Sequence, residues 1–324
     1  MDEFDLIARI LQHFVEAPQL GVVLGPGDDA ALLQPTPGSR LVVSTDMLLS
    51  GVHFPTDTGP QDIAYKALMV NLSDLAAMGA TPRWYTVSLA LPRADEACID
   101  SFCAGLLQAS RPSGIALVGG DITCGSLSVA ITIMGECPDD SAMLRSAACV
   151  GDDIYLTGTI GDAALGLQIL QGRLQAQRED RRCCIERLQR PQARNRAGLA
   201  IRSLAHAAID ISDGLLQDLG HVARASGLQA VVYGHQLPLS DSYQRLVPAT
   251  TGLVPAISFG DDYELCFTAA AVNRQHIESV FTEIQLPCTR IGTMQAGKGI
   301  VFLDHKGRAI STNAKGYQHF MSQG

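Results

Sequence analysis

The sequence predicts a protein of two domains, an α+β domain over residues 1–140 and an α/β domain over residues 141–324. The chain has 324 residues, 47% of them hydrophobic, which is enough to bury two cores. About four strand patterns with helices between them fall in the first part, whereas strands and helices alternate along the second part.

The first domain opens with apolar residues at helical spacing over residues 3–15, which predicts an amphipathic helix. Residues 41–46 form a strand pattern with a polar end. Residues 63–76 are apolar almost all round, so we expect a buried helix between Pro60 and Gly79. The other elements predicted here are strands over residues 84–91, 115–121 and 127–136, a Gly-Gly-Asp turn at 119–121, and a helix around residues 102–106.

The second domain opens with a strand pattern over residues 154–158. Residues 209–215 indicate a strand that turns into a helix ending near Gly227. The segment 176–196 is charged, rich in Gln and interrupted by Pro191, so we expect it to be exposed. The remaining elements predicted are a strand over residues 262–267, a helix over residues 272–284 and a strand over residues 300–303.

Pairs of Gly or Ser with Asp are the most informative pattern in the chain. Residues 25–30 (GPGDDA) place two adjacent carboxylates on a turn, where a bound cation would offset their repulsion. Oxygen ligands of this kind suit Mg²⁺ or Ca²⁺. We interpret Asp152 and Asp153 as ordinary turn residues. The aspartates that we expect to gather around metal ions are Asp28, Asp29, Asp46, Asp74, Asp121, Asp210 and Asp213.

Carboxylates that converge on Mg²⁺ are typical of phosphoryl transfer from ATP, in which the metal bridges phosphate oxygens. Arg145 is a candidate for a phosphate contact, and its alternative is a surface salt bridge. His53 lies in a loop near Asp46, and we interpret it as a contact to a substrate phosphate rather than as a turn histidine.

Two glycine-rich motifs resemble nucleotide-binding patterns, but neither fits its pattern fully. Residues 25–30 fit a dinucleotide-binding pattern, but no helix of sufficient length follows, and the two carboxylates would repel a pyrophosphate. Residues 292–298 match part of a P-loop, but Gly299 stands where Ser or Thr is required and a strand follows. We interpret this second motif as a turn between two strands.

Composition excludes several partners and compartments. The net charge is −9 and no basic run occurs, so we expect no nucleic-acid partner. No apolar run reaches about 18 residues, so we expect no membrane span. Nine cysteines, an odd number without a CxxC pair, favour reduced thiols in the cytoplasm and argue against zinc. The acidic start of the chain does not match a secretory signal.

Ordered motifs along residues 4–320 resemble the thiamine-monophosphate kinase family, within the aminoimidazole ribonucleotide (AIR) synthetase-like superfamily. The motifs that carry the resemblance are GDDAAL at 27–32, STD at 44–46, GVHF at 51–54, NLSDLAAMG at 71–79, GGD at 119–121, IDISDGL at 209–215, DDYEL at 261–265 and GYQHF at 316–320.

The resemblance implies an AIR synthetase-like fold in which the sheet of the N-terminal α+β domain pairs with its copy across a homodimer to form a barrel. The N-terminal domain would bind ATP and metal and form the dimer, and the C-terminal α/β domain would cover the cleft. The implied reaction converts ATP and thiamine monophosphate into ADP and thiamine diphosphate with several Mg²⁺ ions.

Site residues follow from the same resemblance, position by position. The implied metal ligands are Asp29, Ser44, Thr45, Asp46, Asp74, Asp121, Asp210 and Asp213. The implied ATP contacts are Gly120, Asp121, Arg145 and Ser212, and the implied contacts to the thiamine substrate are His53, Asp261 and Tyr317. Asp46, Asp74, Asp121 and Arg145 would be catalytic. The family often has Glu where this chain has Asp261.

We expect direct in-line attack on the γ-phosphorus by the substrate phosphate, which is already ionised near neutral pH, so that no strong general base is needed. The alternatives are another ATP-dependent AIR synthetase-like enzyme or a non-catalytic binder of nucleotide or thiamine phosphate. A selenophosphate synthetase would carry a reactive cysteine near its N-terminus, whereas the first cysteine here is Cys98.

Overall fold

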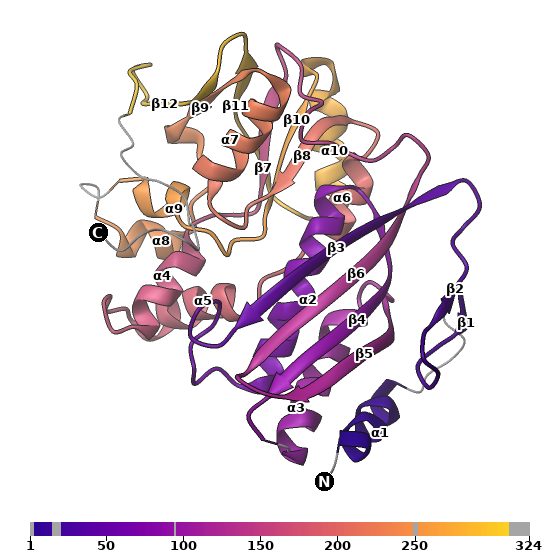
Figure 1. The fold of residues 1–324 in the computed structure, drawn as a ribbon. Helices are drawn as coiled ribbons and strands as arrows, with labels where there is room; N and C mark the ends of the chain where they lie inside the picture. The colour runs from indigo at the N-terminus through magenta and orange to yellow at the C-terminus, as the bar shows by residue number, and fades with distance from the viewer. Residues whose placement is uncertain (1–2, 15–20, 94, 249–251, 311–324) are drawn as a thin grey trace. The chain divides into compact units, whose positions relative to one another are not determined.

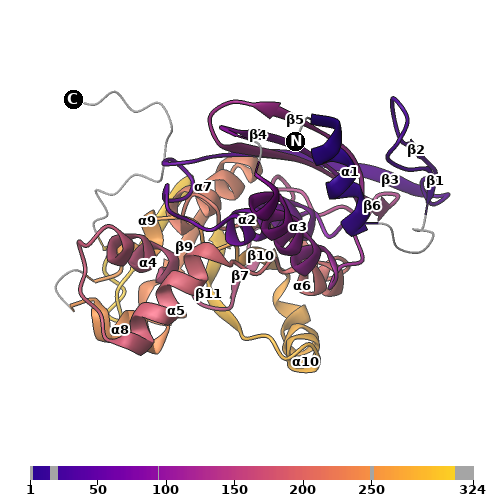
Figure 2. The same cartoon turned by 90° about the horizontal axis from the view of Figure 1, so that it is seen from below.

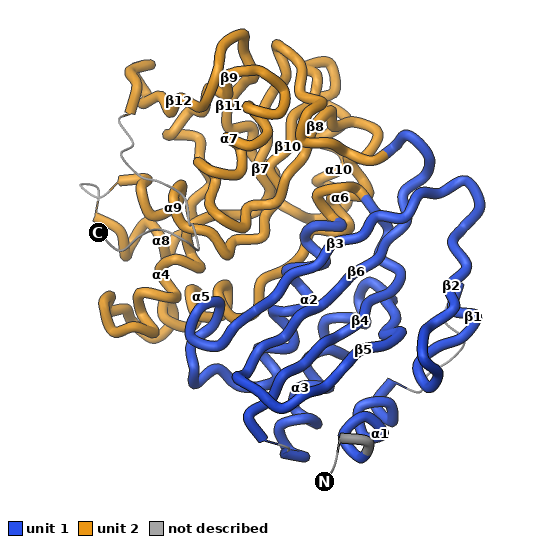
Figure 3. Tube along the Cα trace, in the orientation of Figure 1, with its two compact units in different colours: residues 1–75, 80–141 blue, residues 76–79, 142–324 orange. Residues whose placement is uncertain are grey.

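The computed structural model describes residues 3–14, 21–93, 95–248 and 252–310. The chain forms two compact units, which are residues 1–75 with 80–141 (unit 1) and residues 76–79 with 142–324 (unit 2) (Figure 3). In the described ranges, no helix combines the length and the hydropathy that crossing a membrane requires.

Unit 1 is built on a four-stranded sheet in the order β3-β6-β4-β5, so β3 and β5 are its two edges (Figure 1). The β4–β5 pair is parallel, and β6 is antiparallel to both β3 and β4. The elements of this part of the chain are α1 (Glu3–Phe14), β1 (Val22–Leu24), β2 (Leu32–Leu33), β3 (Ser39–Leu49), α2 (Pro60–Ala77), β4 (Thr81–Leu91), α3 (Glu96–Ser110), β5 (Ala116–Cys124) and β6 (Ser128–Pro138).

The two faces of this sheet differ. Helices α2 and α3 cover one face (Figures 1 and 2), and Leu48 and Ile131 are buried there. Side chains alternate along a strand, so the residues of β3 on either side of Leu48, and every second residue from them, lie on the opposite face. There Val43 is 59% exposed and Met47 is 53% exposed. The second face of the sheet is therefore open to solvent along β3 in this chain.

The hairpin of β1 and β2 was not predicted from the sequence. Its residues Val22 and Leu33 pack against Trp84 of β4 and against Ala116 and Val118 of β5. The loop at residues 25–30 joins the two strands of this hairpin. The GDD motif thus belongs to a hairpin on the β5 side of the sheet.

Unit 2 is built on a six-stranded sheet in the order β12-β9-β11-β7-β10-β8. Only the β12–β9 pair is parallel among the described pairs, so the sheet is mainly antiparallel. The elements are β7 (Asp153–Thr157), α4 (Asp162–Leu170), α5 (Arg178–Gln189), α6 (Asn195–Ile201), β8 (Ala205–Asp210), α7 (Leu215–Ser226), β9 (Gln229–Tyr233), η1 (Gly234–Gln236), α8 (Asp241–Leu246), α9 (Val254–Ser258), β10 (Leu265–Ala269), η2 (Ala271–Asn273), α10 (Arg274–Glu283), β11 (Cys288–Gln295) and β12 (Gly299–Leu303).

Helices cover both faces of the unit 2 sheet, and β7 shows why. Ile154 and Leu156 face a core shared with α4 and α7. Tyr155, between them, faces a second core with α6 and α10, in which it stacks on Phe267 with ring centroids 5.1 Å apart. A strand that is apolar on both faces is expected where helices pack on both sides.

Three predicted elements are confirmed with small changes in their bounds. Helix α2 begins at Pro60 and is followed by Gly79 in the left-handed region, at a φ of 66°. Residues 296–298 form a turn between β11 and β12, as predicted for the P-loop-like motif. Helix α10 lies within the predicted range of 272–284.

The prediction that residues 176–196 are simply exposed is wrong. Helix α5 forms there, and Cys184 and Leu188 are buried in the unit 2 core. Arg187 and Arg194 reach the buried carboxylate of Glu264, at 2.7 Å and 2.5 Å. The charged composition suggested exposure, because the partner of Arg187 and Arg194 is a carboxylate far away in the sequence.

Two local predictions also need correction. Gly119-Gly120-Asp121 is not a turn, because β5 continues through it to Cys124 along the parallel strand β4. A Cβ at position 120 would lie 2.2 Å from the carbonyl oxygen of Val87, so the close strand approach requires glycine there. The strand predicted at 262–267 begins only at Leu265.

Asp152 and Asp153 are not solvated turn residues. Their exposed fractions are 2% and 0%. Arg274 Nε and Arg290 Nη1 donate to the carboxylate of Asp153, at 2.6 Å and 3.1 Å. Both carboxylates are therefore buried, and Asp153 is a structural group at the start of β7.

Candidate active site

Strand β3 and helix α2 bring together three of the predicted metal ligands. Ser44 and Asp46 lie two residues apart on the face of β3 that α2 covers. Ser44 Oγ donates to Asp74 Oδ2 of α2 at 2.5 Å. The backbone N–H of Asp46 donates to the side chain of buried Asn71, at 3.1 Å, one helical turn before Asp74. Two carboxylates and one hydroxyl thus form an oxygen-rich group within unit 1.

Thr45 lies on the other face of β3, because side chains alternate. Its hydroxyl donates to the carbonyl of Ile131 at 3.0 Å and accepts from Thr132 Oγ1 at 3.2 Å. The sequence predicted a strand end that delivers Ser44, Thr45 and Asp46 together. The strand instead continues to Leu49, so its alternation separates Thr45 from its two neighbours.

Asp121 lies on β5, at the opposite edge of the sheet from β3. The register places Asp121 beside Ser88 of β4, which pairs in turn with Ala130 and Met47 on the open face. Asp46 is one residue before Met47 and pairs with Ile131, so its side chain lies on the covered face. Three interstrand spacings separate β3 from β5, or about 14 Å. One Mg²⁺ ion with oxygen ligands at about 2.1 Å cannot contact both carboxylates within one chain.

Asp29 shares this position on the β5 side. It is exposed in the loop between β1 and β2, where its backbone N–H donates to Asp28 Oδ1 at 2.8 Å. Because the hairpin packs on Trp84 and on β5, Asp29 and Asp121 belong to the same side of unit 1. The structure therefore divides the predicted ligands of unit 1 into a β3 group and a β5 group.

His53 lies in the tight loop that follows β3. Its Nδ1 accepts from the backbone N–H of Leu49 at 3.0 Å, so the neutral ring carries its proton on Nε2. Buried Lys66 of α2 donates to the carbonyl of His53 at 3.3 Å and supports the loop from below. The ring thus has one defined tautomer.

In unit 2, the turn between β8 and α7 carries Asp210, Ser212 and Asp213. Asp210 ends β8 and is only 3% exposed. Ser212 is exposed, and Gln217 Nε2 donates to Asp213 Oδ2 at 2.8 Å. The sequence prediction of a strand that turns into a helix with these residues at the turn is confirmed.

A second segment brings Asp261 beside this turn. The backbone N–H groups of Asp261 and Tyr263 donate to the carbonyls of Ser212 and Ile211, at 2.9 Å and 2.8 Å. A Cβ at Gly260 would lie 1.7 Å from the carbonyl oxygen of Ser212. Asp261 and Tyr263 both have positive φ, 67° and 51°. Left-handed residues other than glycine cost about 1 kcal/mol each and concentrate at functional sites.

Sequence analysis missed Asp218, in the first turn of α7. Its Oδ2 accepts from the backbone N–H groups of Asp213 and Gly214, both at 3.0 Å. Burial, with the charges of Asp210 and Asp213, raises the pKa of Asp218 to about 8. The available signal was an acidic residue in the apolar stripe of α7, next to Leu215 and Leu219.

Buried carboxylates flank Asp261 and fix its segment. Both carboxylate oxygens of Asp262 accept from the N–H of Gly161 at 3.0 Å, and burial raises the pKa of Asp262 well above its usual range. Glu264 accepts from Thr157 Oγ1 at 2.7 Å in addition to its two arginines. The DDYEL motif therefore presents one accessible carboxylate on a rigid support.

Arg145 is exposed and lies beside α7. Its carbonyl accepts from Ser226 Oγ at 3.1 Å. Burial, Arg224 and Arg145 lower the pKa of His221, and Asp213 opposes them. Tyr317 lies outside the described residues.

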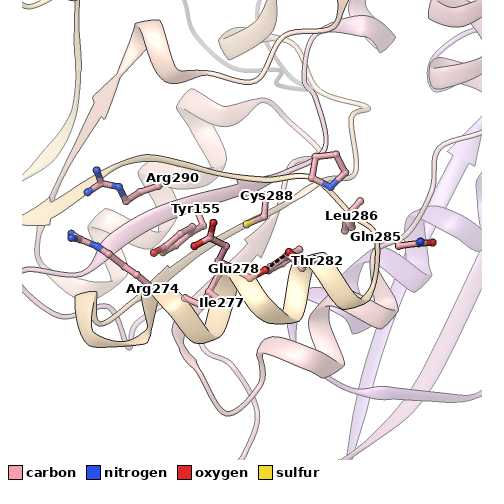
Figure 4. A pocket seen from close by; sticks show the side chains of 11 residues that line it. Tyr155, Arg274, Ile277, Glu278, Thr282, Gln285, Leu286, Cys288 and Arg290 are labelled. Carbon is pink, nitrogen blue, oxygen red and sulfur yellow. Dashed lines mark hydrogen bonds between the residues drawn. The ribbon is translucent and has the colours of Figure 1, made fainter.

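A cavity of about 520 Å³ in unit 2 lies elsewhere, between α10 and strands β7 and β11 (Figure 4). Tyr155, Ile277 and Cys288 line it, with Arg274 and Arg290 at one end. None of the predicted site residues lines this cavity.

Comparisons with known proteins give the family of the chain. The family described as AIR synthase related protein, N-terminal domain, matches residues 27–137, and the corresponding C-terminal domain matches residues 150–305. Thiamine-monophosphate kinase of Escherichia coli K12 is 46% identical over 320 residues, which cover 98% of each chain.

Solved structures agree as well. The crystal structure of thiamine-monophosphate kinase from Stenotrophomonas maltophilia K279a has a TM-score of 0.87 and 45% identity, and covers 96% of this chain and 98% of its own. A structure described as AaThiL complexed with AMPPCP and TMP has a TM-score of 0.78 and 29% identity, and covers 98% of this chain and 96% of its own. The chain therefore belongs to the thiamine-monophosphate kinase family, within the AIR synthase related proteins.

Proposed function

We propose that the protein transfers the γ-phosphoryl group of ATP to thiamine monophosphate and releases ADP and thiamine diphosphate. The observation that carries this proposal is the 46% identity to a thiamine-monophosphate kinase over 98% of both chains. The fold shared with AaThiL, described as a complex with AMPPCP and TMP, supports a site for ATP and for a thiamine phosphate.

The donor set around β3 and α2 fits Mg²⁺. Ser44, Asp46 and Asp74 offer only oxygen atoms, and two of these atoms already lie 2.5 Å apart across the Ser44–Asp74 contact. When bound, Mg²⁺ offsets the charge that develops on the transferring phosphoryl group. In unit 2, Asp210 and Asp213 offer a second set of oxygens for the same purpose, and Ser212 lies between them.

A second copy of this chain would complete the unit 1 ligand set. Asp29 and Asp121 lie on the β5 side, about 14 Å from the β3 group by strand spacing. We infer that the unit 1 sheets of two copies pair edge to edge, with β3 of one chain beside β5 of the other, so that the partner's Asp121 approaches Asp46. The exposed apolar residues of β3, Leu41, Val43, Met47 and Leu49, support this homodimer, since they are 38–59% exposed in one chain.

We propose for each residue the role that the family resemblance implies. Arg145 contacts ATP phosphates with its exposed guanidinium, and Ser212 and Gly120 contact the nucleotide with backbone or hydroxyl groups. His53 donates from Nε2 to the phosphate of the thiamine substrate. Asp261, held by the Ser212 carbonyl, and Tyr317 contact the rest of that substrate. Asp261 is one methylene shorter than Glu, and its left-handed backbone sets where its carboxylate points.

The mechanism needs orientation more than proton transfer. The substrate phosphate is ionised near neutral pH, so the chain aligns two anions rather than activating a nucleophile. Arg145 binds the phosphates of ATP, and His53 binds the phosphate of the thiamine substrate. No covalent phosphoenzyme forms. The nine cysteines are all free thiols, which supports a cytoplasmic enzyme.

The decisive experiment measures ADP release with ATP and Mg²⁺, with and without thiamine monophosphate, and identifies the product by chromatography. We expect ADP release that depends on thiamine monophosphate and an equal yield of thiamine diphosphate. ADP release that responds instead to a purine intermediate, or binding without turnover, would refute the proposal. A ³²P label that resides transiently on the protein and is chased into product would overturn the direct mechanism.

A further inference from the structure

A Cys, an Asp and a His meet in unit 2 apart from the predicted metal ligands. One ligand atom from each of Cys149, Asp152 and His206 lies within 4.8 Å of the others. His206 is near the start of β8, whereas Asp210 ends that strand. Four residues of extended chain separate the two by about 13 Å. The group is therefore distinct from the aspartates at the β8–α7 turn.

A tight turn presents the first two side chains. The N–H of Asp152 donates to the carbonyl of Cys149 at 3.1 Å, and the N–H of Cys149 donates to Asp152 Oδ2 at 2.9 Å. Gly151, at a φ of 90°, allows the turn and donates its N–H to the carbonyl of Met294 at 2.9 Å. The Cys-x-x-Asp spacing resembles the Cys-x-x-Cys turns of zinc sites, with a carboxylate in place of the second thiolate.

The carboxylate of Asp152 is oriented from several sides. Thr268 Oγ1 of β10 donates to its Oδ2 at 3.1 Å, and His206 Nδ1 lies 2.9 Å from both oxygens. Ligand atoms of a tetrahedral zinc ion are about 3.3 Å apart, given bond lengths of about 2.0–2.1 Å. A small movement of His206 therefore admits a metal ion between the two groups. Cys149 is exposed and His206 is 38% exposed, so the group is open to solvent.

We propose that Cys149, Asp152 and His206 bind one divalent transition-metal ion, with zinc as the preferred ion and water in the fourth position. The ligand set of sulfur, nitrogen and oxygen suits zinc and is unsuited to Mg²⁺. The absence of a CxxC pair argued against zinc in the sequence, but the third ligand lies 54 residues beyond Asp152, where no spacing rule finds it. The bound ion ties the turn before β7 to β8.

Cobalt is the probe, because a thiolate bound to Co²⁺ gives a charge-transfer absorption that oxygen ligands do not give. The full-length protein is titrated with Co²⁺ without oxygen, in excess Mg²⁺ that occupies the all-oxygen sites. We expect a near-ultraviolet band that saturates at one Co²⁺ per chain and disappears when one equivalent of Zn²⁺ is added. Absence of the band in the wild-type protein would overturn the proposal.

Variants assign the ligands. Cys149→Ser should abolish the band, and His206→Gln should weaken Zn²⁺ binding strongly. Thr268→Val, which removes only a partner of Asp152, should keep the band and weaken binding by roughly 10- to 100-fold. Cys124→Ser and His276→Gln are matched controls at other exposed positions and should change nothing. A band that survives Cys149→Ser, or is lost in Cys124→Ser, would refute the assignment.

Discussion

Ser44 Oγ and Asp74 Oδ2 are joined by a 2.5 Å hydrogen bond that links the edge strand β3 to the buried helix α2. A half-buried carboxylate is costly unless it is hydrogen-bonded or binds a cation. The hydroxyl of Ser44 holds one carboxylate oxygen of Asp74 in a fixed direction. The contact therefore orients Asp74 and leaves it suited to a metal ligand role next to Asp46.

Replacement of Asp74 by Asn should remove turnover without unfolding the protein. The Asn side chain still accepts from Ser44 Oγ, but it lacks the charge that a cation requires. We expect kcat to fall by about 10²- to 10³-fold or more, with an unchanged circular dichroism spectrum. Asp139→Asn, at an exposed aspartate paired with Arg40, is the control and should keep full activity. Near-normal rates for Asp74→Asn at low Mg²⁺ would contradict the metal assignment.

Asp218 should act as a neutral hydrogen-bond acceptor in the metal-free protein. Its pKa of about 8 means that it is mainly protonated at pH 7. Asp218→Asn keeps an acceptor for the N–H groups of Asp213 and Gly214, whereas Asp218→Ala leaves both without one. We expect Asp218→Ala to lower the free energy of unfolding by about 1–3 kcal/mol and Asp218→Asn to change it little.

Urea unfolding in the presence of a chelator measures both variants, and the Mg²⁺ dependence of turnover shows whether the turn still presents Asp213. Equal damage by the two substitutions would show that an ionised carboxylate is required at position 218.

Gly260→Ala should damage the segment that carries Asp261. The added methyl group would lie 1.7 Å from the carbonyl oxygen of Ser212, so the two segments must separate. We expect KM for thiamine monophosphate to rise and the midpoint of thermal unfolding to fall. Gly220→Ala is the matched control, because no atom lies within 4 Å of a Cβ there, in the middle of α7. That substitution should stabilise the protein by about 0.5–1 kcal/mol. Similar behaviour of the two variants would contradict the packing.

Local sequence patterns were sufficient to predict α2 and the β8–α7 turn. An apolar segment with one Asp predicts a buried helix with a functional carboxylate, and the structure places Asp74 there, against Ser44. The IDISDGL motif predicts a strand, a turn and a helix, all of which form.

Strand order and long-range pairing could not be predicted in this way. No local pattern shows that β5 pairs in parallel with β4 and is an edge strand, so the distance between Asp46 and Asp121 was hidden. Arg187 and Arg194 were expected to be exposed because their partner, Glu264, lies 77 and 70 residues further along the chain. For Asp218 the sequence offers only its place in the apolar stripe of α7, because its partners are the backbone N–H groups of Asp213 and Gly214.

The ion pairs of Asp153 should make stability depend on acid. Burial alone would raise the pKa of Asp153, but hydrogen bonds from Arg274 and Arg290 offset it and the pKa is lowered. An aspartate with a lower pKa in the folded state contributes stability above the unfolded pKa of about 3.9, and loses it as pH falls through the folded pKa. Both arginines are half exposed, so Asp153→Asn should cost only about 1–3 kcal/mol at pH 7.

The difference in unfolding free energy between the wild-type protein and Asp153→Asn, measured from neutral pH down to about pH 2, should stay constant to about pH 4 and then shrink. Asp139→Asn, at a pair on the surface, is the control and should show no such change. A difference that grows as pH falls would show that the pKa of Asp153 is not lowered.

Mixed dimers of Asp46→Asn and Asp121→Asn test whether two chains share a site. Each variant alone should be inactive. If Asp46 of one chain works with the partner's Asp121, a mixed dimer has one site with both mutations and one with neither. Random assembly makes half of the dimers mixed, so co-expression should restore about a quarter of wild-type activity. The mixture of Asp46→Asn with Asp74→Asn is the control: both residues belong to the β3 side, so every site carries one mutation and no activity should return. If mixed dimers of Asp46→Asn and Asp121→Asn form but show no activity, the two carboxylates act within one chain, and the shared site is refuted.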